Sequence, residues 1–299
     1  MKSTLVYSTV FPGIEPYLED WYDSILRQSA SDFTLCIGQD ELGRDSVCKA
    51  AGRTVDASWI LAPRGSTIAE VRNAGLGEVA SQEGFVVTVD SDDILLPDRV
   101  QHARAALADA DVVACAIELA AEDGSPTGDV VTLPKSVQAT EILPRCNIFG
   151  LSNSAWRTEM LRSCLPVPRE ALLVDWYLVT QAWLSGAVLR FDPRVGMLYR
   201  QYDRSSAQIR PPFTAQQVCR DTDKVCRHFE LVKDGFRRGQ DRVRQGELVA
   251  VAEDVTRFRD VICEDADALE DYLQRLNKSD CGRVWWESIA FQGLRSLWS

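Results

Sequence analysis

The chain has 299 residues, of which 45% are hydrophobic, and its formal net charge is −11. A nucleic-acid binder needs a basic surface to meet the phosphate backbone, so this charge argues against that class of protein. The nine cysteines include no Cys-x-x-Cys pair and follow no regular spacing, which indicates free thiols in a reducing compartment rather than disulfides or a zinc site. No signal peptide and no apolar run of about 18 residues is evident, so we expect a cytoplasmic protein.

The first third of the chain alternates between strand and helix patterns. Apolar and alternating residues predict strands at 5–11, 33–39, 59–61 and 85–89. Between the first two strands, Leu18, Trp21 and Ile25 lie at helical spacing. A capping box of Thr67 and Glu70 opens a second helix. Strand-helix-strand order is typical of a parallel sheet.

The apolar run 85–89 ends in Asp90-Ser91-Asp92-Asp93. Ligands of parallel sheets bind beyond the carboxyl ends of the strands, so these acids are expected to face the binding crevice. Two carboxylates about 5 Å apart repel by roughly 3 kcal/mol at an effective dielectric near 20, which favours a bound cation. Mg²⁺ or Mn²⁺ fits, because one or two carboxylates and substrate phosphates hold such ions. The alternative is a solvated acidic turn in which Asp93 caps the next helix.

The pattern continues less regularly after the acidic cluster. We expect a helix at 97–110, a turn at 122–126, and strands at 112–119, 188–191 and 197–199. Prolines interrupt residues 134–169 repeatedly, and such an irregular segment suits a substrate-facing surface. A helix is expected to begin at Asp175 and to end at Gly186. Pro211 and Pro212 close this part of the chain.

The sequence predicts two parts, a domain over residues 1–212 and a helical region over residues 213–299. Two apolar stripes at helical spacing, separated by a break at 235–239, predict a helical hairpin in the second part.

The tail, residues 282–299, carries large apolar side chains at helical spacing: Trp285, Trp286, Ile289, Phe291, Leu294, Leu297 and Trp298. Something must cover a surface this apolar. Packing onto the rest of the chain or onto a second subunit is one interpretation. Membrane-surface binding is the other, and a nearby basic run would assist it: Lys233, Arg237, Arg238, Arg242 and Arg244.

Several segments, in order, resemble the inverting family 2 glycosyltransferases. Val71-Arg72-Asn73-Ala74-Gly75-Leu76 is similar to the Ala-Arg-Asn-x-Gly segment of that family, and Asp90-Ser91-Asp92-Asp93 is similar to its metal-binding acidic motif. Val174-Asp175-Trp176 resembles its Glu-Asp-Trp segment, and Tyr199-Arg200-Gln201 resembles the Tyr-Arg segment that ends its catalytic domain. With residues 24–37, the resemblance spans about residues 3–207.

The resemblance implies an α/β protein with a GT-A type nucleotide-sugar-binding fold, a mostly parallel central sheet and a C-terminal helical appendage. It implies an inverting transfer from a nucleotide diphosphate sugar, with uridine as the expected base, to a hydroxyl of a glycan or lipid-linked acceptor in surface polysaccharide synthesis. Asp175 would be the catalytic base, and Asp92, with Asp90, would hold Mn²⁺ or Mg²⁺. The implied donor-binding residues are Thr9, Phe11, Asp40, Arg72, Asn73, Asp90, Ser91 and Arg200. A homo-oligomer, or peripheral contact of the C-terminal helices with the inner face of the membrane, is a further expectation.

The same residues also have purely structural interpretations. Asp175 could be a helix N-cap, and Asp40 could be a turn residue. Arg72 and Asn73 could be the solvated face of an amphipathic helix.

Two departures from the family pattern leave other functions open. Val174 replaces the family's Glu, and Tyr202 stands where a histidine of some relatives approaches the metal. A catalytically silent, nucleotide-binding subunit is one alternative; Asp175 argues against it and Val174 argues for it. A nucleotidyltransferase is another, although residues 10–15 lack the Gly-rich basic loop that a triphosphate needs.

Overall fold

The computed structural model of the chain describes residues 3–202 and 208–299. Its strands are β1 (Ser3–Val10), β2 (Thr34–Gln39), β3 (Ser58–Leu61), β4 (Gly84–Thr88), β5 (Ile94–Leu95), β6 (Val112–Ala120), β7 (Pro126–Val131), β8 (Ser154–Arg157) and β9 (Leu189–Arg200). Its helices are α1 (Leu18–Leu26), α2 (Arg44–Ala50), α3 (Ile68–Ser81), α4 (Arg99–Ala106), α5 (Ala139–Ile142), α6 (Thr158–Cys164), α7 (Val174–Leu184), α8 (Ala215–Asp234), α9 (Arg242–Phe258) and α10 (Ala266–Leu276). Short 3₁₀ turns at Glu15–Tyr17 and Gln292–Leu297 and a π-helical turn at Arg259–Cys263 complete these elements.

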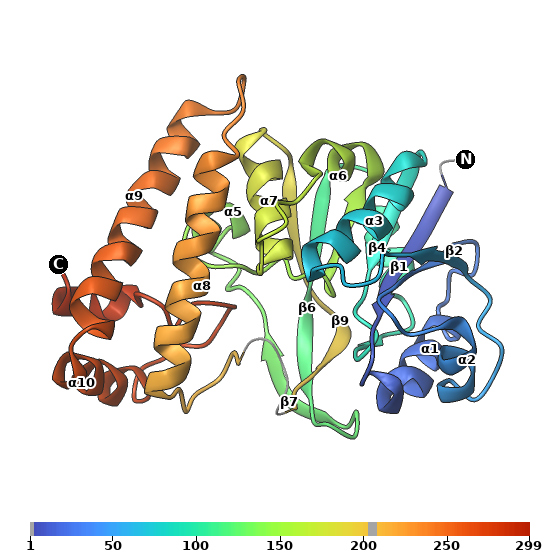
Figure 1. Cartoon of the computed structure of the whole chain (residues 1–299), viewed down its shortest axis with the longest axis horizontal. Coiled ribbons are helices and arrows are strands. Elements are labelled where there is room, and N and C mark those ends of the chain that lie inside the picture. Colours follow the sequence, from blue (N-terminus) through green and yellow to red (C-terminus); the bar gives the residue numbers. More distant parts are fainter. Residues whose placement is uncertain (1–2, 203–207) are drawn as a thin grey trace.

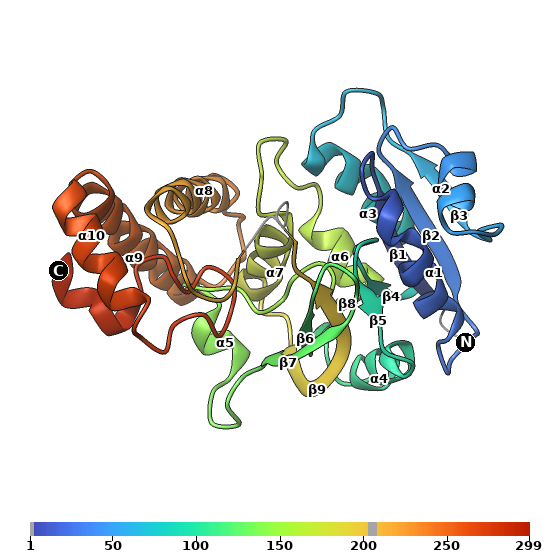
Figure 2. The ribbon, with the colours of Figure 1, turned by 90° about the horizontal axis from the view of Figure 1, so that it is seen from below.

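One sheet joins all the strands, in the order β3-β2-β1-β4-β8-β6-β9-β5, with β7 paired to β6 (Figures 1 and 2). The pairs β1–β2, β1–β4, β2–β3 and β6–β9 are parallel, whereas β8 runs antiparallel to both β4 and β6. Six strands therefore share one direction, and the prediction of a mostly parallel sheet is confirmed. Every residue of β1 after Ser3 is buried, because helices and loops cover both faces of the sheet there.

Most of the predicted early elements are present. The capping box at α3 is confirmed, with the Thr67 hydroxyl accepting from the Glu70 N–H and the Glu70 carboxylate accepting from the Thr67 N–H. The helix expected at 97–110 is shorter and covers only α4. The strands expected at 188–191 and 197–199 are one strand, β9, whose register against β6 shifts around Ala116. Pro193 and Gly196 interrupt the apolar pattern of β9, which is why it reads as two strands.

Residues 134–169 are more regular than expected. They contain α5, β8 and α6, and β8 fills the space between β4 and β6 in the sheet. The strand β8 is only four residues long, which is too short for a periodic sequence pattern to predict it.

The helices α8, α9 and α10 lie together at one end of the molecule, and α1, α2 and α3 lie at the other end (Figures 1 and 2). The helices α8 and α9 pack against each other, as the two apolar stripes predict, and α8 also contacts α7. Among the described residues, no helix has both the length and the apolar character needed to cross a membrane.

The prediction of helical spacing throughout the tail is wrong. Trp286 and Ala290 have φ angles of 70° and 49°, which a right-handed helix excludes, and the only helical turn is Gln292–Leu297. The tail packs on its own chain, with Trp285, Ile289 and Trp298 all buried. The Trp298 ring meets Phe258 of α9 and Tyr272 of α10 edge-on.

Candidate functional site

The candidate site lies where β1, β2 and β4 end. The pairing of Val10 with Gln39, and of Tyr7 with Thr88, brings the carboxyl ends of these parallel strands to one edge of the sheet. The residues that follow them, including Phe11, Asp40 and the acidic segment 90–93, therefore gather at that edge. Phe11 and Asp40 are both partly buried, and desolvation followed by the charge of Glu41 raises the pKa of Asp40.

A half-buried ion pair stands at the centre of this edge. Arg72 of α3 donates to the Thr9 hydroxyl at 2.7 Å and to Asp90 Oδ1 at 2.5 Å. The side chains of Arg72 and Asp90 are only 13% and 27% exposed. Burial, the largest single influence, would lower the pKa of Arg72, but the charge of Asp90, its hydrogen bond and the charges of Tyr7 and Asp92 together raise it. The Arg72 guanidinium is therefore held by α3 against the strand-end residues Thr9 and Asp90. Arg72 is not the solvated residue of the alternative interpretation.

Gly75 allows α3 to lie this close to β1. A Cβ atom on Gly75 would stand 2.0 Å from the Tyr7 hydroxyl oxygen, and one on Gly38 would stand 2.6 Å from the same atom. The Tyr7 hydroxyl in turn lies 3.0 Å from the Thr9 hydroxyl. Gly75 thus lets Tyr7 fit under Arg72, which gives a physical reason for the Arg-Asn-x-Gly spacing.

Asp93 anchors the acidic segment instead of capping α4. It is buried, and its carboxylate accepts from the Ser152 hydroxyl and, at 2.9 Å, from the Arg200 backbone N–H. The residue at the N-cap of α4 is Asp98, so the interpretation of Asp93 as a cap is wrong. Burial, and then the charge of Asp92, raises the pKa of Asp93 well above its ordinary value.

Arg200 supports the acidic segment from behind. Its guanidinium donates to the Asp92 carbonyl at 2.8 Å, to the Glu122 carbonyl, and to the Asp20 carboxylate at 3.0 Å. It also lies over the Tyr17 ring at 4.8 Å. The Arg200 side chain is only 2% exposed, and these contacts tie it to other groups of the protein.

Two further predicted donor residues also bond to protein atoms. Asn73 exchanges two hydrogen bonds of 2.8 Å with the backbone of Val167, which fixes the segment that leads into α7. The buried Ser91 hydroxyl donates to the Thr9 carbonyl at 2.7 Å and ties the acidic segment to β1.

The carboxylates of Asp90 and Asp92 are the residues that suit a divalent cation. Among residues 3–202 and 208–299, no group of three or more His, Cys, Asp or Glu side chains is arranged to hold a metal. Two carboxylates still fit Mg²⁺ or Mn²⁺, which completes its shell with water and phosphate oxygens. Desolvation, and then the charge of Asp90, raises the pKa of Asp92, and a cation would relieve that repulsion. The Tyr202 hydroxyl donates to Asp92 Oδ2 at 2.8 Å.

Asp175 lies in the first turn of α7. The N-cap of that helix is Leu173, so the interpretation of Asp175 as an N-cap is wrong. Asn147 donates from Nδ2 to Asp175 Oδ2 at 2.8 Å. Burial raises the pKa of Asp175 to about 6, with a smaller contribution from the charge of Asp90. A carboxylate with this pKa can accept a proton near neutral pH.

The structure brings Asp175 and the strand-end cluster together. The charges of Asp90 and Arg72 both act on Asp175, which places the first turn of α7 within electrostatic reach of that cluster. Sequence reasoning missed Asn147, because it lies in the segment expected to be irregular and a lone Asn carries no pattern.

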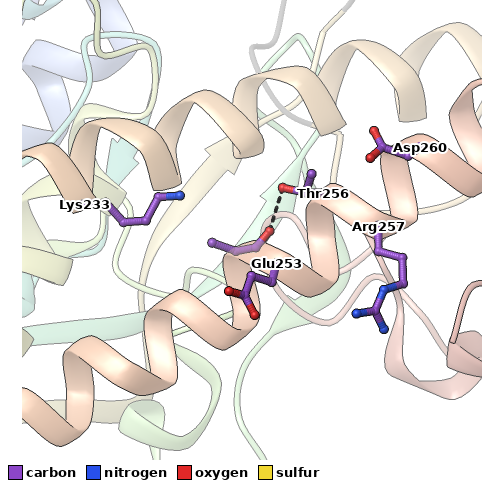
Figure 3. A pocket seen from close by; sticks show the side chains of 6 residues that line it. Lys233, Glu253, Thr256, Arg257 and Asp260 are labelled. Atoms are coloured by element: carbon purple, nitrogen blue, oxygen red, sulfur yellow. Dashed lines mark hydrogen bonds between the residues drawn. The ribbon is translucent and has the colours of Figure 1, made fainter.

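One surface hollow lies away from these residues. It measures about 330 Å³ and lies along α8 and α9, lined by Lys233, Ala252, Glu253, Thr256, Arg257 and Asp260 (Figure 3). Its side chains carry both signs of charge, and none of them belongs to the strand-end cluster.

No protein-family model matches the sequence, and no curated protein matches it. Solved structures do match the fold. The mannosyltransferase PcManGT from Pyrobaculum calidifontis, in complex with GDP-Man and Mn²⁺, has a TM-score of 0.59 at 14% identity, covering 99% of this chain and 84% of that chain. The chain has a GT-A type, nucleotide-sugar-binding fold.

Two structures of S. aureus TarS agree with this assignment of the fold. TarS has a TM-score of 0.60 at 15% identity, and the match covers 92% of this chain but 47% of TarS, so the chain spans about half of that protein. TarS 1–349 in complex with UDP-GlcNAc has a TM-score of 0.53 at 15% identity, covering 93% of this chain and 90% of that chain.

Proposed function

We propose that the chain is an inverting, metal-dependent glycosyltransferase of the family 2 type. It moves a sugar from a uridine diphosphate donor to a hydroxyl of a glycan or lipid-linked acceptor, as an enzyme of surface polysaccharide synthesis. The observation that carries the proposal is that Asp175, whose pKa is raised to about 6, lies within electrostatic reach of the Arg72–Asp90 ion pair at the strand ends. The similar structures support it, because one holds UDP-GlcNAc and another holds GDP-Man with Mn²⁺.

The proposed reaction gives Asp175 one task. The acceptor hydroxyl loses its proton to Asp175 as its oxygen forms a bond to the anomeric carbon, and the bond from that carbon to the diphosphate breaks on the opposite face. Asp92, with Asp90, would hold the divalent cation, which compensates the charge of the diphosphate. Thr9, Phe11 and Asp40 border the space proposed for the nucleoside.

Arg72, Asn73, Ser91 and Arg200 are proposed to shape the donor site. Arg72 neutralises Asp90, and the other three fix the backbone that carries the acids or leads into α7.

We also propose that residues 1–212 form the catalytic domain and residues 213–299 its helical appendage. The nine cysteines are all free, which supports a reducing, cytoplasmic location.

The test is turnover of a panel of UDP, GDP and TDP sugars with Mn²⁺, measured as donor hydrolysis and as transfer to candidate acceptors. We expect the wild-type chain to turn over one donor class, and Asp175→Asn to bind that donor normally but to react about 100-fold to 10,000-fold more slowly. Near-normal turnover by Asp175→Asn would remove it from the mechanism. Binding of a donor with no turnover in the wild type would favour the silent subunit.

A further inference from the structure

Asn147 is held in one orientation beside Asp175. It is fully buried, and its side-chain oxygen accepts from the Phe149 N–H at 2.9 Å while its Nδ2 donates to the Phe149 carbonyl at 3.2 Å. The Phe149 N–H needs an acceptor, so the Asn147 carboxamide cannot flip by 180° without losing that bond. This orientation leaves Nδ2 as the atom that faces Asp175 Oδ2, at 2.8 Å.

The tail holds the backbone of Asn147. The N–H of each of Asn147 and Trp285 donates to the carbonyl of the other, both at 3.1 Å. The Trp285 ring meets Tyr199 edge-on at 5.6 Å, and a Cβ on Gly150 would stand 3.2 Å from that ring. The ring therefore packs on the same loop that begins at Asn147.

The tail is fixed in a conformation that its own residues disfavour. Trp286 and Ala290 have φ angles of 70° and 49°, which residues with a side chain rarely adopt. Two anchors hold it: Glu287 accepts from the N–H of Gly282 at 2.9 Å, and the Tyr272 hydroxyl donates to the Ser288 carbonyl at 2.8 Å. Strain of this kind persists only where the surrounding structure imposes it. Here the strained segment holds the backbone of Asn147.

We propose that Asn147 is a positioning residue for Asp175, and that the tail segment 282–291 belongs to the catalytic site because it holds Asn147 in place. The hydrogen bond to Oδ2 fixes the carboxylate and favours its ionised form. This assignment of role rests on the proposed function. The other charged groups that act on Asp175 are Asp90 and Arg72, and neither lies on the tail or on the loop that begins at Asn147.

The experiment measures the pKa of Asp175 by NMR titration of the full chain labelled with carboxyl-¹³C aspartate. In Asn147→Ala we expect the pKa to rise by about 1 unit, because a hydrogen bond to a charged group is lost. Asn277→Ala is the matched control, since Asn277 exchanges two bonds of 2.7 and 3.0 Å with the Phe213 backbone and makes no contact with Asp175. In the Asn277→Ala variant, the pKa of Asp175 should equal that of the wild type.

A second pair of variants tests the tail. Trp285→Ala should raise the pKa of Asp175 in the same direction by a smaller amount, whereas Trp298→Ala, an equally buried tail tryptophan, should leave it unchanged. Asn147→Ser, which keeps a polar group beside Phe149, replaces Asn147→Ala if that variant does not fold.

An Asp175 pKa that stays within about 0.2 unit of the wild type in the Asn147 variants would overturn the proposal. If the pKa of Asp175 shifts equally in the Trp285 and Trp298 variants, the tail has no part in positioning Asn147. The titration needs neither donor nor acceptor, so a wild-type chain without turnover would refute the proposed function and leave this result standing.

Discussion

At the residue scale, the proposed chemistry depends on the proton that Asp175 would accept. An ordinary aspartate is ionised at all pH values above about 5, whereas burial gives Asp175 a pKa of about 6. The carboxylate must be ionised to act as a base, so the active fraction falls as the pH drops through that value.

We predict that kcat, measured at saturating donor and Mn²⁺, falls about tenfold for each pH unit below 6 and is level above about 7. Saturation matters because Asp92 also has a raised pKa and its protonation would weaken metal binding. Donor hydrolysis followed across this range checks the prediction. A kcat that stays constant down to pH 5 would show that no group with this pKa limits the reaction.

At the element scale, the contact between α3 and β1 sets the shape of the proposed donor site. Gly75 faces Tyr7, whereas Gly77, two residues further along α3, is exposed and a Cβ added there would meet no atom within 4 Å. The two glycines therefore form a matched pair within one helix.

We predict that Gly75→Ala lowers the free energy of unfolding by about 1–3 kcal/mol, because the methyl group would displace Tyr7. It should also weaken donor binding, since Tyr7 contacts Thr9 and Thr9 accepts from Arg72. Gly77→Ala should instead stabilise the chain by about 0.5–1 kcal/mol, as alanine is the better helix former. Urea unfolding of both variants measures these changes. Equal changes in the free energy of unfolding would contradict the role given to Gly75.

The sequence predicts those elements whose pattern is local. The capping box of Thr67, the apolar strand before Asp90 and the stripes of α8 and α9 each follow from a few neighbouring residues. The rest depends on contacts between distant segments. No local pattern distinguishes Arg200, which braces the acidic segment, from an arginine that meets phosphate, and none places Asn147 beside Asp175. The turn at Trp286 is likewise imposed by the tertiary structure, against the helical spacing of the tail.

At the scale of the whole molecule, α7 joins the candidate site to the C-terminal helices. Trp176, next to Asp175, stacks on His228 of α8 with ring centroids 4.3 Å apart. His228 is buried, and its Nε2 has no hydrogen-bond partner among the described residues. Desolvation lowers the pKa of His228 to about 3.

This histidine should make the stability of the chain depend on pH. The unfolded chain binds a proton at His228 below about pH 6.5 and the folded chain does not, so stability is full above that value and is lost as the pH falls toward 3. We predict that His228→Phe, which keeps the stack on Trp176, gains about 2 kcal/mol relative to the wild type between pH 8 and pH 5. Urea unfolding at the two pH values measures this gain. A difference that does not change with pH would show that His228 is charged, or accessible to water, in the folded chain.

In the proposed function, Asp92, in the segment that follows β4, forms a metal-dependent site for a nucleotide diphosphate. Calorimetric titration of UDP and of GDP into the full chain, with and without Mn²⁺, tests it most directly. Asp92→Ala is the informative variant, and Asp109→Ala, an exposed carboxylate after α4, controls for the same change in net charge. We predict that Mn²⁺ tightens binding of one nucleotide at least about tenfold in the wild type and in Asp109→Ala, and that Asp92→Ala loses this gain. Binding that is equally strong without Mn²⁺, or a full metal effect in Asp92→Ala, would contradict the account.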